Sequence, residues 1–84
     1  MGKPSAEDSG NPSLAAFASR LIEARTRKMW RQEDLAAASG VSQSYISQLE
    51  KGKWEPKMTT VLLLARALGA SLDDLLPPDD IGIQ

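Results

Sequence analysis

Two of the side chains that most often carry catalysis or bind metals are missing from this sequence of 84 residues. It has no histidine and no cysteine, so the usual imidazole base, a thiolate metal site and a disulfide are all ruled out. Adjacent acids such as Asp73 and Asp74 would point apart on a short helix, with no partner base beside them. We therefore expect no enzyme, no metal site and no cofactor.

Uncharged hydrogen-bonding groups gather in one short segment instead. A helix from about Gln43 to Lys51 would direct Ile46 and Leu49 inward. Its outer face would then show four polar side chains, those of Gln43, Ser44, Ser47 and Gln48. Amides and hydroxyls both donate and accept hydrogen bonds without carrying charge. Such a face can bind another polar surface through hydrogen bonds.

A second short helix is expected directly before this face. The segment from Gln32 to Ser39 would put Leu35 inward, and Gly40 suits a left-handed helix end because it has no side chain to clash. Val41 would fill the corner, and the hydroxyl of Ser42 would cap the next helix. The sequence thus predicts two short helices joined by a tight turn.

These residues resemble the helix-turn-helix of phage repressors and Cro proteins, the XRE-like regulators. The resemblance covers about Leu14 to Leu76 and is completed by Gly52 and Pro56 after the second helix. The matching frame consists of Gln32, Glu33, Leu35, Ala36, Gly40, Val41, Ser42, Ile46, Ser47 and Glu50. It implies an all-α, five-helix lambda-repressor-like DNA-binding domain, with helices two and three as the helix-turn-helix.

The resemblance also implies a function for the protein. It is that of a sequence-specific regulator of transcription, a repressor, which reads the major groove of double-stranded DNA as a homodimer on a palindromic operator. By the family's pattern Gln43, Ser44 and Gln48 face the bases, and a glutamine amide can pair bidentately with adenine. Contacts to the DNA backbone or beside the reading helix are expected from Arg31, Gln32, Ser42, Tyr45, Ser47, Lys51, Lys53 and Lys57.

Three further residues have expected roles around this motif. In the family an arginine at the place of Arg25 pairs with the acid at Glu50, which would tie the first helix to the reading helix. Arg31 stands where Ser or Thr commonly caps the second helix, so either that helix begins loosely or the cation meets a phosphate. Trp54 is expected to pack against the fourth helix rather than on the DNA backbone.

The remaining elements follow from helical spacing and caps. Residues 1–11 are expected to be a flexible arm, residues 12–76 the domain and residues 77–84 a tail. The first helix should run from Pro12 to about Lys28. The fourth should run from about Thr60 to Leu68, with Thr59 as cap and with Met58, Val61, Leu62, Ala65 and Leu68 as its inward stripe. Ser71 should cap a last helix from Leu72 to Leu76.

Charge and exposed apolar residues indicate the partners. The net charge is −1, yet residues 20–57 hold eight Lys and Arg against five Asp and Glu, so basic charge surrounds the motif. Leu63 with Ala67 and Ala70 could form a dimer surface. The alternative is an antitoxin or another module on the same fold that binds a partner protein such as a toxin. RNA polymerase is another candidate partner.

No apolar run approaches the roughly 20 residues that a membrane span needs. The first residues, Met-Gly-Lys-Pro-Ser-Ala-Glu-Asp, lack the apolar segment of a signal peptide. We therefore expect a cytoplasmic protein without a membrane partner.

Overall fold

The computed structural model describes residues 12–76, and all of its regular elements in that range are helices. They are α2 (Pro12–Arg27), α3 (Gln32–Ser39), α4 (Gln43–Glu50), α5 (Met58–Leu68) and α6 (Leu72–Leu75). The predicted all-α fold with five helices is confirmed over these residues. The expected arm, residues 1–11, and the expected tail, residues 77–84, lie outside the described range.

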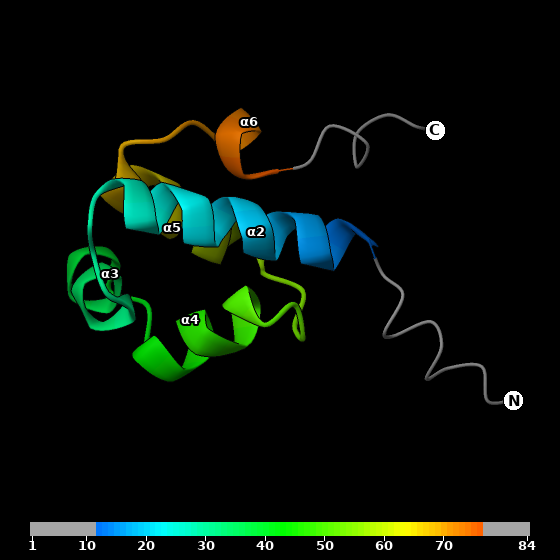
Figure 1. The fold of residues 1–84 in the computed structure, drawn as a ribbon, viewed down its shortest axis with the longest axis horizontal. Helices are drawn as coiled ribbons and strands as arrows, with labels where there is room; N and C mark the ends of the chain where they lie inside the picture. The colour runs from blue at the N-terminus through cyan, green and yellow to red at the C-terminus, as the bar shows by residue number, and fades with distance from the viewer. Residues whose placement is uncertain (1–11, 77–84) are drawn as a thin grey trace, which may run out of the picture.

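One hydrophobic core holds the helices together. Figure 1 shows α3 and α4 on one side of α2 and α6 on the other. The core takes large side chains from every described helix, and burying each removes apolar surface from water. The largest fully buried ones are Leu21, Leu35, Ile46, Leu49, Leu64, Leu75 and Val61. The α3–α4 pair is therefore anchored to the rest of the domain through its inner face.

The tight turn between α3 and α4 forms as the sequence predicts. Gly40 has a φ of 83°, in the left-handed region, and its N–H donates to the carbonyl of Ala36. Val41 is buried at the corner. The hydroxyl of Ser42 accepts a hydrogen bond from the N–H of Tyr45 at 3.2 Å. These local contacts set the angle at which α4 leaves the domain.

The predicted start of α5 is wrong, and its predicted stripe is right at Val61, Ala65 and Leu68 but wrong at Met58 and Leu62. The helix begins at Met58 rather than Thr60, so Thr59 lies inside it and does not cap it. Pro56 restricts the residue before it and not those after it, so a helix can begin at once. Met58 and Leu62, both expected inside, are 55% and 44% exposed. The buried stripe is instead formed by Thr60, Val61, Leu64, Ala65 and Leu68.

The other helix ends fall within one residue of the prediction. Ser71 caps α6, since its hydroxyl accepts from the N–H of Asp74 while the Asp74 carboxylate accepts from the N–H of Ser71. Trp30 is half-buried against the core. None of the helices in residues 12–76 is both long and apolar enough to cross a membrane.

Candidate nucleic-acid interface

The outer face of α4 presents uncharged polar groups at its beginning. Gln43 and Ser44 are exposed, and the cap residue Ser42 is exposed beside them. Ser47 and Gln48, one turn further on, are half-buried. The first turn of α4 is therefore the most accessible part of the predicted reading face, and it can both donate and accept hydrogen bonds.

An ion pair fixes the other end of α4. The Arg25 Nε donates to Glu50 Oε2 at 2.7 Å, and its Nη2 donates to Glu50 Oε1 at 3.0 Å. The two side chains are only 14% and 5% exposed. The hydrogen bonds that Arg25 donates to Glu50 raise the pKa of the Arg25 guanidinium, burial opposes this, and the charge of Glu50 adds to the rise. The first helix and the reading helix are thus joined as the sequence led us to expect.

Two further hydrogen bonds extend this pair into a four-residue network. Arg25 Nη1 donates to the carbonyl of Trp30 at 2.7 Å. Gln32 Nε2 donates to Glu50 Oε1 at 3.0 Å. Sequence reasoning placed Gln32 only at a phosphate and missed this contact, although a buried carboxylate calls for further donors. The network ties α2, the link after it, and the start of α3 to the end of α4.

Arg31 is engaged with acids rather than left free. The backbone N–H of Arg31 donates to Asp34 Oδ2 at 2.7 Å. This side-chain hydrogen bond fixes the start of α3, which is therefore not loose. The guanidinium lies 3.2 Å from Glu33 and 3.7 Å from Asp34. Its charge is therefore already balanced in part, which weakens it as a partner for phosphate.

The loop after α4 carries three lysines without an acidic partner among the described residues. Lys51, Lys53 and Lys57 are exposed, and none of them forms an ion pair with a residue in the range 12–76. Arg25, Arg27 and Arg31 all have acidic partners. Arg20, Lys28 and Arg66 also have no acidic partner within residues 12–76, but the three loop lysines are grouped within seven positions of the chain directly after α4.

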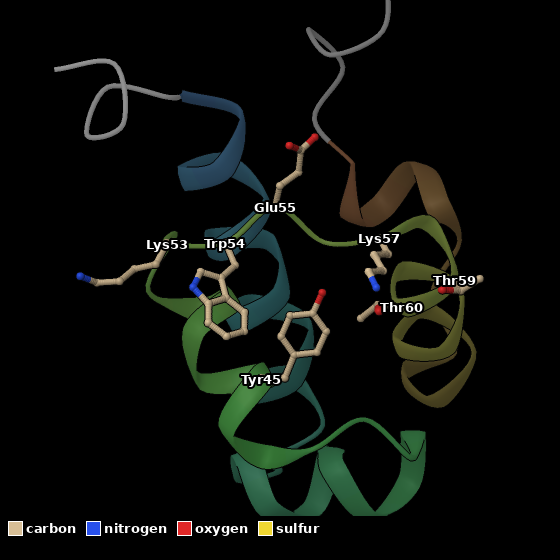
Figure 2. A pocket seen from close by; sticks show the side chains of 7 residues that line it. All are labelled: Tyr45, Lys53, Trp54, Glu55, Lys57, Thr59 and Thr60. Atoms are coloured by element: carbon tan, nitrogen blue, oxygen red, sulfur yellow. The ribbon is translucent and has the colours of Figure 1, made fainter. Parts of the chain in front are cut away.

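A hollow of about 770 Å³ lies between α4, this loop and the start of α5. Figure 2 shows the side chains around it, which are Tyr45, Lys53, Trp54, Glu55, Lys57, Thr59 and Thr60. The ring partner of Trp54 is Tyr45 of α4, whereas we expected α5. Their centroids are 5.5 Å apart and the rings are tilted by 50°.

The outer face of α5 exposes apolar side chains. Leu63 is 41% exposed, and Leu62 beside it is 44% exposed. Ala67 and Ala70 are half-buried and pack partly against the core. The accessible apolar surface is therefore centred on Leu62 and Leu63 rather than spread along the expected line of Leu63, Ala67 and Ala70.

Comparison with known proteins identifies the family of this chain. A family model for helix-turn-helix proteins matches residues 21–75. The chain belongs to this XRE-type helix-turn-helix family. It is 42% identical over 62 residues to an uncharacterised HTH-type transcriptional regulator of Sinorhizobium fredii, covering 74% of this chain and 80% of the relative. This helix-turn-helix protein is accordingly a DNA-binding regulator and not an enzyme.

Two solved structures resemble the regulator. The restriction-modification controller protein C.AhdI of Aeromonas hydrophila superposes with a TM-score of 0.75 at 36% identity, over 79% of this chain and 100% of that one. A hypothetical transcription factor from Neisseria gives a TM-score of 0.72 at 32% identity, over 81% and 79% of the two chains. Both likenesses span most of the described helices.

Proposed function

We propose that this regulator reads one specific double-stranded DNA sequence by laying α4 in the major groove. The observation that carries the proposal is the uncharged, exposed pair Gln43 and Ser44 at the start of a helix whose end is held by Glu50. The first residues of a reading helix meet the base edges in this geometry. Gln43 and Gln48 can each pair with an adenine, while Ser44 accepts several bases.

Contacts to the DNA backbone position the protein without reading sequence. Lys51, Lys53 and Lys57 are the cations best placed for this role, since they are exposed beside α4. The amide-rich start of α3 at Gln32 would take another phosphate. The smaller contributions in this proposal come from Arg31, Ser42, Tyr45 and Ser47.

The experiment that tests the proposal is selection of bound sequences from random duplex DNA. Two copies related by twofold symmetry would enrich a palindrome whose half-sites are about 10 base pairs apart, centre to centre. Folded protein that enriches no sequence at low salt would refute sequence reading. It would favour the module that binds a partner protein.

We also propose that the regulator acts as a homodimer through the outer face of α5. Leu62 and Leu63 expose adjacent apolar surface there, and a symmetric pair would bury it against itself. Leu63→Lys should shift sedimentation toward monomer. The matched control is Ile22→Lys, because Ile22 is 36% exposed on α2 and should leave the assembly unchanged. An unchanged Leu63→Lys protein would indicate that the face serves another partner or none.

Finally, we propose repression in the cytoplasm as the outcome of binding. A dimer that covers about one turn of a promoter would exclude polymerase from it. Transcription in vitro from a promoter that overlaps the selected operator should fall as protein is added, and a rise would identify an activator. Support comes from the related controller of a restriction-modification system, which is itself a regulator by its name.

A further inference from the structure

The hollow beside α4 has one side lined by hydrogen-bond donors. In the view of Figure 2 the Tyr45 hydroxyl, the Lys57 ammonium and the Thr60 hydroxyl point toward the same part of it. Glu55, the one acid among the lining residues, points away from these three groups, and Lys53 extends beyond Trp54. This part of the hollow therefore combines positive charge with hydroxyl groups.

These donors have room for an acceptor. Thr60 is only 8% exposed, and its hydroxyl makes no hydrogen bond within the described part of the chain. No fully buried side-chain oxygen in that part of the chain lacks a partner, so the oxygen of Thr60 is accessible to solvent, and Thr60 lines the hollow. At the start of α5 the side chain of the cap residue, Lys57, forms no hydrogen bond with the backbone amides of the first turn. A cation, hydroxyls and free amides together suit an oxyanion.

Trp54 carries no charge, but its ring lies next to one of these donors, Tyr45. Its indole is 52% exposed, so it adds little to the core. Its ring lies beside that of Tyr45, at 5.5 Å between centroids. A tilted aromatic contact of this kind restricts the rotation of both rings. The indole therefore limits where the Tyr45 hydroxyl can lie.

We propose that Trp54 is a positioning residue for DNA binding: it holds the Tyr45 hydroxyl beside Lys57 and Thr60, and these three bind one phosphodiester group of the DNA backbone. The inference rests on the proposed reading of DNA by α4. It adds a link between the reading helix and the loop, because Tyr45 belongs to α4 while Trp54 and Lys57 belong to the segment that follows it.

A double-mutant cycle on the full chain tests the link. Trp54→Ala and Tyr45→Phe should each weaken operator binding roughly tenfold, the size expected when a hydrogen bond to a charged group is lost. The double variant should bind about as well as either single variant, because Trp54 acts through the hydroxyl that Tyr45→Phe removes. Trp54→Phe keeps an aromatic neighbour and should restore binding to within about twofold of the parent.

The melting temperature separates positioning from folding. Trp54→Ala should melt near the parent, because the indole is half exposed. Two results would overturn the proposal. One is an additive loss in the double variant, which would mean that the indole contacts DNA by itself. The other is unchanged binding by Trp54→Ala.

Lys57 tests the nature of the anion. Lys57→Gln should lower the slope of log affinity against log salt by about two for the dimer, as expected when each subunit loses one phosphate contact. Arg27→Gln is the matched control, because Arg27 pairs with Glu23 on α2, and it should leave the slope unchanged. An unchanged salt slope in Lys57→Gln would overturn the assignment of this site to a DNA phosphate.

Different results would refute the proposed reading of DNA and the positioning role of Trp54. Parent protein that selects no DNA sequence refutes the proposed function. Parent protein that selects an operator, with an additive cycle at Tyr45 and Trp54, refutes only the positioning role.

Discussion

Glu50 is the residue on which the placement of α4 depends most. Its carboxylate accepts two hydrogen bonds from Arg25 and one from Gln32, and its side chain is 5% exposed. A buried charge is tolerated only when its partners are present. Three helices are therefore joined at one carboxylate, at the end of α4 away from the exposed Gln43 and Ser44.

Arg25→Ala should lower the free energy of unfolding by about 3 kcal/mol, because Glu50 would stay buried without its cation. Thermal or urea unfolding measures this. Replacing both partners, as in Arg25→Met with Glu50→Leu, should cost less than the single change, since no charge is left alone. Arg27→Ala, from a pair exposed by 73% and 68%, should change stability by less than about 0.5 kcal/mol. A parent-like melting temperature for Arg25→Ala would contradict this role.

Titration of Arg25 should not change the stabilisation by the Arg25–Glu50 pair near neutral pH. Glu50 raises the pKa of Arg25 in the folded state. A raised folded pKa means that the stabilisation is complete below the unfolded pKa and is lost as pH rises through the folded value. That window lies far above neutral pH. The difference in melting temperature between the parent and Arg25→Ala should therefore be constant from about pH 6 to 9, and a steady decline would contradict it.

At the scale of helices, two ends use the same left-handed backbone with different residues. Gly40 closes α3 at a φ of 83°, and Met29 follows α2 at a φ of 62°. Met29 is 89% exposed, so burial of its side chain does not offset the conformational strain. A side chain in this region costs roughly 1–2 kcal/mol, whereas glycine adopts it freely.

The two ends should therefore respond in opposite directions. Met29→Gly should stabilise the protein by about 1 kcal/mol, and Gly40→Ala should destabilise it by about the same amount. A Cβ at Gly40 would meet nothing within 4 Å, so the loss would report the backbone alone. Met29→Ala is the control, because it keeps the strain, and it should melt close to the parent. Equal stability of all three variants would refute the strain at Met29.

The elements predicted well are those with local signals. Gly40 and Ser42 define the turn between α3 and α4 within a few residues, so the sequence sufficed. The outward face of α5 could not be predicted in the same way, because Leu62 and Leu64 flank the line of Val61, Ala65 and Leu68 on opposite sides, and only packing against the other helices decides which of the two is buried. The Gln32–Glu50 and Tyr45–Trp54 contacts also escaped prediction. They join separate segments, and only the packed structure brings them together.

At the scale of the whole molecule, a net charge of −1 conceals an uneven surface. The arginines at positions 25, 27 and 31 are balanced by acids, while the three loop lysines are not paired within residues 12–76. If each lysine contacts one phosphate, a dimer releases counterions from about six, and log affinity should fall with log salt with a slope of about −5. Titrations at several salt concentrations measure this, and affinity independent of salt would contradict a backbone-contacting loop.

The central claim is that Gln43 on α4 reads a base, and one measurement tests it most directly. Parent and Gln43→Ala protein would be titrated against the selected operator and against each of its single base-pair variants. The account predicts that Gln43→Ala loses discrimination, about 1–3 kcal/mol, at one symmetric pair of positions and keeps it elsewhere. An equal loss at every position, or undiminished discrimination, would show that Gln43 does not read the sequence.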